Sequence, residues 1–131
     1  MKWVSKGKKK NYSIKRFFKS FTYAFSGIKT ALKTEQNFLF DIIFGLLTII
    51  IGFLLKLNGI EFTIILLAIG LVISLELINT AIEYTIDMAM PEIHPLAKAS
   101  KDISAAAVFI SSLIAFIIGL IIYLPKFIAL F

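Results

Sequence analysis

The sequence lacks several residue types on which common kinds of protein site depend. It has no cysteine, which excludes disulfides, thiolate metal sites and cysteine nucleophiles. It has a single histidine, which excludes histidine-rich zinc sites and every motif that needs two histidines. The phosphate-binding and nucleophile motifs GxxxxGK[ST], GxGxxG and GxSxG are missing as well. Any use of ATP would therefore need a fold other than the common nucleotide-binding ones.

Charged residues are scarce, at 17% of the chain, and acidic residues are missing from its first part. No Asp or Glu precedes Glu35, whereas ten of the fourteen Lys and Arg residues lie between Lys2 and Lys33. So basic a segment is typical of proteins that bind nucleic acid or anionic lipid. The long apolar segments that follow it favour lipid, so we expect a membrane partner and no nucleic acid.

Hydrophobic residues, in contrast, make up 59% of the 131 residues, against roughly 45–50% in average soluble domains. Three apolar segments are long enough to cross a bilayer, which takes roughly 17–25 helical residues. The sequence therefore predicts an all-α membrane protein with one transmembrane domain over residues 34–131. Its transmembrane helices are expected at about 36–56, 60–80 and 103–125. The link Lys56-Leu57-Asn58-Gly59 predicts a tight hairpin between the first two.

A fourth helix is predicted over residues 12–33, after a basic tail at residues 1–11. Apolar residues recur in it mostly every three or four positions, and lysines occupy the other side. The apolar positions are Ile14, Phe17, Phe18, Phe21, Phe25, Ile28 and Leu32. An amphipathic helix of this kind lies on the membrane surface, in the plane of the lipid headgroups.

The distribution of Lys and Arg predicts the orientation of the chain in the membrane. With the N-terminus in the cytoplasm, that face holds the ten N-terminal basic residues together with Lys98 and Lys101. The opposite face then holds only Lys56 and Lys126. This bias places the N-terminus inside the cell and the C-terminus outside.

Carboxylates occur where a membrane-spanning segment should have none. Glu76, Asn79, Glu83 and Asp87 are spaced by three, four and four residues, which places them on one face of a helix. Charges near the bilayer centre cost roughly 2.5 kcal/mol or more, so they persist where they are paired or functional. Because the hairpin returns the second span to the start of the first, Glu35 can approach Glu83.

Two carboxylates without cysteine suit a hard cation, above all Mg²⁺, which in phosphoryl transfer binds carboxylates, phosphate oxygens and water. The following segment adds His94, Lys98, Lys101 and Asp102 on the same side. Lysines bind phosphate, and carboxylates act as bases. The pattern therefore predicts a polar functional site at the cytoplasmic interface.

Simpler explanations remain open for single residues. A carboxylate at a helix end, such as Glu35, Asp41, Glu61 or Glu92, is often only solvated, and an isolated His94 is more often a hydrogen-bonding loop residue. Two other classes of protein also remain open. One is a small channel or transporter subunit whose carboxylates line an ion path, and the other is a membrane scaffold without enzymatic activity. A channel would need polar residues through the whole bilayer, whereas the outer half of each span is apolar.

One block of residues resembles a known family. Glu76-Leu77-Ile78-Asn79-Thr80-Ala81-Ile82-Glu83, followed by Asp87 and by Lys101-Asp102, is similar to the signature of the small prokaryotic integral-membrane lipid kinases. These are the bacterial diacylglycerol kinases and the undecaprenol kinases of Gram-positive bacteria. The resemblance extends from about Arg16 to Pro125. It implies a homotrimer in the bacterial plasma membrane, with active sites shared between neighbouring subunits, that transfers the γ-phosphate of ATP to a lipid hydroxyl.

The resemblance also implies a role for each matching residue. Glu76 matches the catalytic base, and Glu35 and Glu83 match the ligands of the Mg²⁺ that accompanies ATP. Asn79 and Asp87 match residues that support the active site. The positions that match nucleotide contacts are Arg16, Tyr23, Glu35, Glu83, Glu92, His94, Lys101 and Asp102.

Composition distinguishes the two branches of this family. The abundance of lysine, phenylalanine and isoleucine and the Leu124-Pro125-Lys126 ending resemble the Gram-positive branch. Leu39 and Phe40 are apolar where we associate more polar residues with the diacylglycerol kinases. The resemblance therefore favours undecaprenol as the lipid substrate, with diacylglycerol as the alternative.

Overall fold

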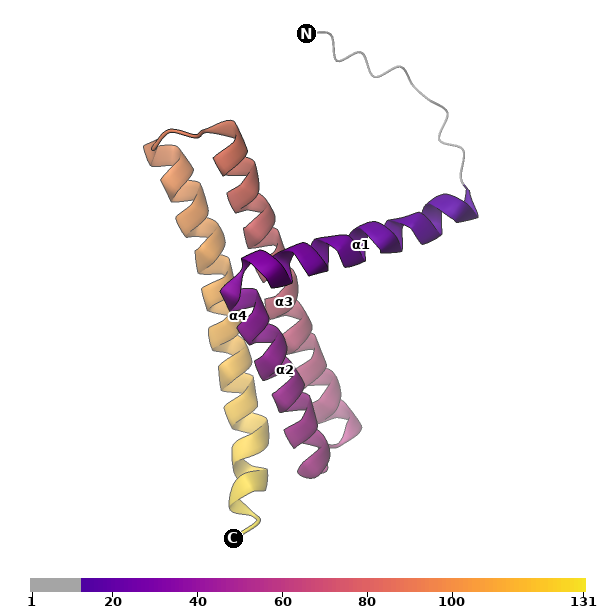
Figure 1. Ribbon diagram of the computed structural model, residues 1–131. Helices are drawn as coiled ribbons and strands as arrows, with labels where there is room; N and C mark the ends of the chain where they lie inside the picture. The colour runs from indigo at the N-terminus through magenta and orange to yellow at the C-terminus, as the bar shows by residue number, and fades with distance from the viewer. Residues whose placement is uncertain (1–12) are drawn as a thin grey trace.

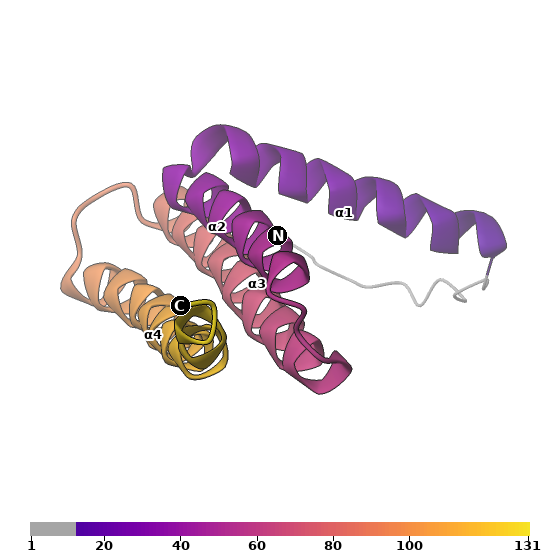
Figure 2. The ribbon, with the colours of Figure 1, turned by 90° about the horizontal axis from the view of Figure 1, so that it is seen from below.

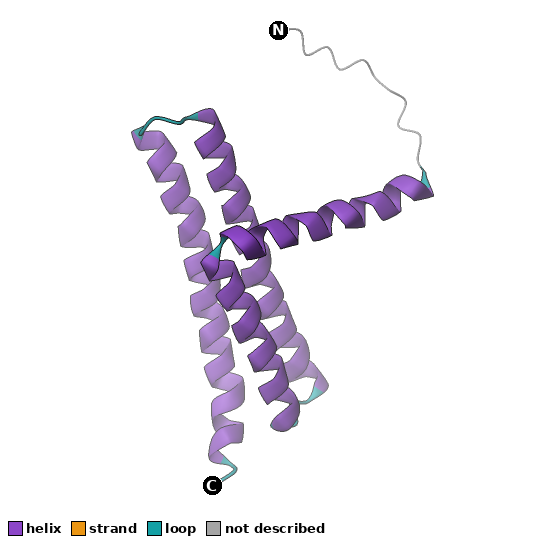
Figure 3. Ribbon diagram, viewed as in Figure 1, coloured by secondary structure: helices purple, strands orange, loops and turns teal. Residues whose placement is uncertain are grey.

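A computed structural model describes residues 13–131, which form four helices (Figure 1). The helices are α1 (Ile14–Thr34), α2 (Gln36–Leu54), α3 (Gly59–Ala89) and α4 (Pro95–Ile128). Figure 3 shows helices joined by short connections, and the described residues include no strand. This confirms the all-α prediction. The predicted basic tail, residues 1–11, lies outside the described residues.

Three of these helices, α2, α3 and α4, are long and apolar enough to cross a membrane. They run alongside one another. At the end opposite the α2–α3 turn, α1 extends away from the start of α2, and α3 and α4 continue past it to their connecting loop (Figure 1). We call this the α1 end, and we call the opposite end, with the α2–α3 turn and the C-terminus, the hairpin end. With three such spans, the chain is a membrane protein.

Two helices extend beyond the membrane spans predicted for them. Helix α3 continues to Ala89, past the span predicted at about 60–80, and α4 begins at Pro95, ahead of the span predicted at about 103–125. The prediction followed apolar residues, but helical hydrogen bonding continues through the polar residues beyond them. The 31 residues of α3 span roughly 46 Å at 1.5 Å per residue, against about 30 Å of bilayer hydrocarbon. The excess carries the polar residues at the α1 end.

The α2–α3 turn is tight, as its sequence predicted. Lys56 adopts a left-handed backbone conformation, with φ of 53°. Asn58 then caps α3, because its side-chain oxygen accepts hydrogen bonds from the backbone N–H groups of Ile60 and Glu61 at 3.0 and 2.9 Å. The Glu61 carboxylate accepts the backbone N–H of Asn58 at 2.8 Å, which completes a capping box. The turn therefore fixes the antiparallel pairing of α2 and α3.

Helix α3 packs against both α2 and α4, and Figure 2 shows it between them. Small buried residues let the helices approach closely, as is typical of membrane helices. At Gly52 of α2, an added Cβ would lie 2.9 Å from the Tyr123 hydroxyl of α4. That hydroxyl donates a hydrogen bond to the Thr48 carbonyl at 2.8 Å. At the hairpin end, Lys126 forms an ion pair with Glu61 at 3.0 Å.

Candidate functional site

The corner between α1 and α2 places Glu35. This single residue separates the two helices, and its backbone is extended, with φ of −113° and ψ of 108°. Ala31 on one side and Phe38 on the other are buried, so apolar packing holds the corner against the bundle. The half-buried Glu35 is therefore fixed where α1 meets the bundle.

A second contact ties this corner to α3. The Tyr84 hydroxyl donates a hydrogen bond to the Thr34 hydroxyl at 2.7 Å. Thr34 immediately precedes Glu35, and Tyr84 immediately follows Glu83. The bond therefore sets the position of the Glu35 corner relative to the part of α3 that carries Glu83.

We expect Tyr84→Phe to lower the activity of the protein by up to about tenfold. The variant keeps the ring and removes only the hydrogen bond, which is worth about 0.5–1.5 kcal/mol. Thr63→Val, near the hairpin end of α3, provides a hydroxyl deletion that leaves the Thr34 contact intact, since the Thr63 hydroxyl bonds only to the Gly59 carbonyl of its own helix. Turnover rates measured at saturating ATP would test the prediction, and an unchanged rate in Tyr84→Phe would show that the contact does not position the site.

The predicted polar stripe lies along α3 and becomes more exposed toward the α1 end. Glu76 is buried, at 5% exposure, Asn79 and Glu83 are half-buried, and Asp87 is exposed. The Asn79 side-chain amide donates a hydrogen bond to Glu83 Oε1 at 2.9 Å. Asp87 forms an ion pair with Lys101 of α4. The stripe thus forms one connected polar surface between α3 and α4.

Several carboxylates converge on this surface. Asp41 of α2 and Glu76 of α3 line the same groove, and Glu83 lies about two turns further along α3. Neighbouring carboxylates repel one another when ionised, and a bound cation would relieve that repulsion. Within residues 13–131, no group of three potential ligand residues is close enough to hold a metal ion alone.

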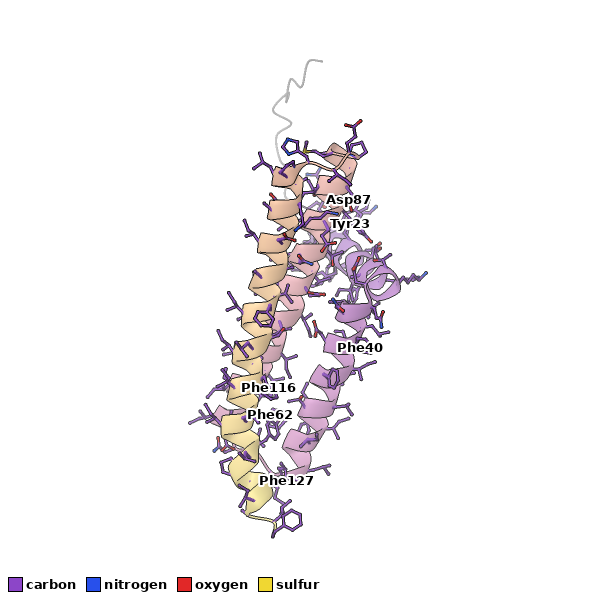
Figure 4. All side chains as sticks on the ribbon, turned by 90° about the vertical axis from the view of Figure 1, so that its left-hand side faces the viewer. Tyr23, Phe40, Phe62, Asp87, Phe116 and Phe127 are labelled. Atoms are coloured by element: carbon purple, nitrogen blue, oxygen red, sulfur yellow. The ribbon has the colours of Figure 1, made fainter. Side chains whose placement is uncertain are left out.

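The residues that match nucleotide contacts come from three parts of the chain. Arg16 and Tyr23 lie on α1, and Figure 4 shows Tyr23 at the same end of the molecule as Asp87. Glu92 is exposed in the α3–α4 loop. Figure 1 shows the beginning of α1 projecting away from the bundle, so the single chain does not bring these three parts together.

Residues near the start of α4 have local partners in the structure. His94 is the N-cap of α4, and its Nδ1 accepts the backbone N–H of Leu96 at 3.2 Å. Asp102 pairs with Lys98 one helical turn away at 2.5 Å, and Lys101 pairs with Asp87. The hydrogen bond from Leu96 agrees with the simpler explanation of His94, in which it is a hydrogen-bonding loop residue.

Two adjoining grooves open beside the carboxylates. One, of 470 Å³, is lined by Glu76 and Asp41 together with residues of α2 and α4. The other, of 610 Å³, continues from Asp41 between α2, α3 and α4 to Tyr123 and Phe127 near the hairpin end. Figure 4 labels Phe127 and Phe116, which line it, on that half of α4. An apolar chain can therefore lie along the bundle with a polar end next to Glu76.

The sequence did not predict two hydrogen bonds of this site, and it did not indicate the importance of Asp41. The Ser104–Asn79 and Tyr84–Thr34 hydrogen bonds join residues 25 and 50 positions apart. A serine beside Ala105-Ala106-Ala107 was a weak signal, since small polar residues mark close contacts between membrane helices. Asp41 was noted only as a helix-end carboxylate, although it lines both grooves.

The fold and the site together define a three-span membrane protein with a carboxylate cluster beside a lipid-sized groove. The chain belongs to the prokaryotic diacylglycerol kinase family, whose family model matches residues 22–123. It is therefore a lipid kinase, and the channel and scaffold explanations are set aside.

Individual relatives come from both branches of the family. The chain is 50% identical over 113 residues to the undecaprenol kinase of Bacillus subtilis (strain 168), covering 86% of this chain and 92% of that protein. It is 37% identical over 112 residues to the diacylglycerol kinase of Synechocystis sp., covering 85% and 64% of the two chains. It is 30% identical over 102 residues to the diacylglycerol kinase of Escherichia coli (strain K12), covering 78% and 84%.

Proposed function

We propose that this protein phosphorylates undecaprenol, with ATP as the phosphoryl donor, at the cytoplasmic face of the membrane. The observation that carries the proposal is the apolar groove that begins at Asp41 beside Glu76 and continues to the hairpin end. A lipid alcohol bound there would place its hydroxyl among the carboxylates. The 50% identity to an undecaprenol kinase supports the same substrate.

The groove suits the apolar chain of either lipid alcohol. Along α2 it is lined from Asp41 to Leu55, which is roughly 21 Å at 1.5 Å per residue, a length that an extended acyl chain and an isoprenoid chain can both fill. The choice of undecaprenol therefore rests on the 50% identity to an undecaprenol kinase. Diacylglycerol remains the second candidate, because several relatives are diacylglycerol kinases.

The proposed chemistry assigns different tasks to the carboxylates. Glu76, at the junction of the groove and the polar stripe, would accept the proton of the lipid hydroxyl. Glu35 and Glu83 would hold the Mg²⁺ of Mg-ATP. When bound, that ion neutralises charge on the β- and γ-phosphates during transfer. Lys101, held by Asp87, would add positive charge near the nucleotide phosphates.

The residues present fit Mg²⁺ better than a softer metal. The donors are carboxylate oxygens, and Mg²⁺ in phosphoryl transfer uses one or two carboxylates with phosphate oxygens and water. Residues 13–131 include no three potential ligands close enough to hold a metal ion alone. Such a site suits an ion that arrives with the nucleotide. The nucleotide itself would contact the α1 end through Arg16, Tyr23, Glu92, His94, Lys101 and Asp102.

We also propose that the protein is a homotrimer assembled through α3, with active sites completed by neighbouring subunits. The face of α3 opposite its packed face is exposed and follows a heptad spacing of alternating four and three residues. This face comprises Ile60, Ile64, Leu67, Leu71, Ser74, Ile78, Ala81 and Thr85. Ser74, Ala81 and Thr85 are small, as is typical of membrane helix interfaces. Sedimentation equilibrium in detergent should give the mass of three chains, and a monomeric mass would contradict the proposal.

Helix α1 would be the surface helix of each subunit. Its large apolar side chains are exposed, with Ile14, Phe17 and Phe25 between 62% and 79% accessible. These side chains would enter the headgroup region, while the lysines of α1 would contact anionic lipid. In this position α1 would hold Arg16 and Tyr23 at the level of the phosphates.

The orientation of the chain follows from its basic residues, and the absence of native cysteine makes it easy to measure. We expect a single cysteine at position 93, in the α3–α4 loop, to react with an impermeant maleimide only from the cytoplasmic side. A single cysteine at position 129 should react only from the outside. The reverse pattern would place the carboxylates on a face without ATP and would contradict the kinase proposal for this site.

A lipid panel tests the choice of substrate. Purified protein with Mg-ATP should phosphorylate undecaprenol in mixed micelles faster than dioleoylglycerol at the same mole fraction. A shorter polyprenol that fills only half of the groove serves as the matched control and should be phosphorylated at an intermediate rate. A preference for dioleoylglycerol would replace undecaprenol with the second candidate.

A further inference from the structure

Ser104 is a buried hydroxyl that the proposed chemistry does not use. It lies on α4, facing α3, and is only 9% exposed. Its Oγ lies 2.6 Å from the side-chain oxygen of Asn79 and 2.9 Å from the carbonyl oxygen of Lys101. It is therefore the point at which α4 contacts the polar stripe of α3 next to Glu83.

The hydrogen bonds around Asn79 have a defined direction. Asn79 Nδ2 lies 2.9 Å from Glu83 Oε1, and an ionised carboxylate only accepts hydrogen bonds. The amide must therefore present its NH₂ group to Glu83 and its oxygen to Ser104. The serine hydroxyl carries one proton and has two acceptors within reach, and the shorter distance, 2.6 Å against 2.9 Å, assigns that proton to Asn79.

This relay of two bonds fixes one metal ligand. If the Asn79 amide turned over, its oxygen would face the Glu83 carboxylate, and the bond to Glu83 would be lost. Because a serine hydroxyl can donate or accept, the bond to Glu83 sets which way the amide faces. The Ser104 bond holds the amide in place between α3 and α4. In the observed orientation, Asn79 holds Oε1 of Glu83, and Oε2 is the oxygen left to bind a cation.

We propose that Ser104 is a positioning residue that acts through Asn79 to hold the Glu83 carboxylate in its metal-binding orientation. The inference rests on the proposed function, because it takes Glu83 as a ligand of the nucleotide-bound cation. Partners beyond the direct ligands of a metal commonly fix ligand orientation and tune affinity. Ser104 thereby couples α4 to a ligand carried by α3.

Helix α4 offers a matched control at Ser111. This residue lies seven positions further along the same face and is also buried, at 4% exposure. Its hydroxyl donates to the Val108 carbonyl at 2.8 Å, one turn back on its own helix. Ser111→Ala therefore removes a buried serine hydroxyl from the same helix interface without touching the relay.

The experiment measures binding of Mn²⁺, as a probe for Mg²⁺, by electron paramagnetic resonance with a non-hydrolysable ATP analogue. Full-length wild-type protein in detergent is compared with Ser104→Ala, Asn79→Ala, the double variant and Ser111→Ala. Ser104→Gly makes the same deletion if Ser104→Ala fails to assemble. We expect Ser104→Ala to weaken Mn²⁺ binding by about three- to tenfold, the effect of one lost neutral hydrogen bond. Ser111→Ala should bind like wild type, and Ser104→Ala should have no further effect in the Asn79→Ala background.

A kinetic measurement adds a second readout. In Ser104→Ala the Mg²⁺ concentration for half-maximal activity should rise by the same factor, while turnover at saturating Mg²⁺ stays within about twofold of wild type.

The inference is overturned by unchanged Mn²⁺ affinity in Ser104→Ala, by an equal loss in Ser111→Ala, or by a loss that persists in the Asn79→Ala background. These outcomes leave the proposed function intact if wild-type protein still phosphorylates a lipid alcohol and Glu83→Gln still loses Mn²⁺. Wild-type affinity in Glu83→Gln would instead remove the metal assignment on which the inference rests.

Discussion

Glu76→Gln is expected to phosphorylate lipid about 10²–10⁴-fold more slowly than wild type, which is the contribution typical of general acid–base catalysis. Glutamine keeps the size and polarity of the side chain but cannot accept the hydroxyl proton. Glu76 is the one member of the stripe that is buried and also lines the groove, where a lipid hydroxyl would arrive. The measurement is the initial rate of lipid phosphorylation at saturating Mg-ATP, with nucleotide binding measured in parallel.

A structural role for Glu76 would give a different result. If Glu76 only stabilised packing, Glu76→Gln would lose assembly in detergent in proportion to its loss of activity. Glu61→Gln makes the same change at the other end of α3 and removes a residue that pairs with Lys126. It should stay active even if it is less stable. A Glu76→Gln protein that assembles, binds nucleotide and phosphorylates lipid near the wild-type rate would exclude Glu76 as the base.

Glu83→Gln should abolish productive use of Mg-ATP while the fold persists. The glutamine oxygen can still accept the hydrogen bond from Asn79, so the change removes charge from the ligand and leaves its position intact. Even partners of a ligand typically contribute about 10–100-fold to metal affinity or activity, and a direct ligand should contribute no less. Glu35→Gln should have a comparable effect, since Glu35 is placed beside the same part of α3.

The dependence of rate on Mg²⁺ concentration checks this assignment. In both variants the apparent affinity for Mg²⁺ should fall, and added Mg²⁺ should restore part of the rate if the second carboxylate still binds. Glu61→Gln again provides the same chemical change away from the site and should keep the wild-type dependence on Mg²⁺. Normal turnover of Glu83→Gln or Glu35→Gln at ordinary Mg²⁺ would remove that residue from the metal site.

The features that the sequence predicted correctly depend on residues that lie close together in the chain. The apolar segments predicted three spans, and the link Lys56-Leu57-Asn58-Gly59 predicted the tight α2–α3 turn. The stripe from Glu76 to Asp87 follows from helical periodicity alone. In each case the interacting residues are close in sequence, so a local pattern contains the information.

The features that sequence did not predict depend on which helix faces meet. Periodicity places Asn79 and Glu83 on one face of α3, but it does not identify Ser104 as the residue of α4 that contacts them. The same holds for Tyr84 and Thr34, which are far apart in sequence and meet only because α3 returns alongside α2 to the corner at Glu35. The apolar segments also did not show how far α3 and α4 continue as helices, because a helix that leaves the bilayer continues without apolar residues.

The central claim is that the carboxylates at the α1 end transfer phosphate to a lipid alcohol in the adjoining groove. Its most direct test is transfer of ³²P from the γ-position of ATP into extracted lipid, in vesicles with and without undecaprenol. The account predicts rapid labelling of undecaprenol by wild-type protein, none in vesicles that lack an alcohol, and almost none with Glu76→Gln. Equal ATP hydrolysis with and without undecaprenol, with no label in the lipid, would contradict it.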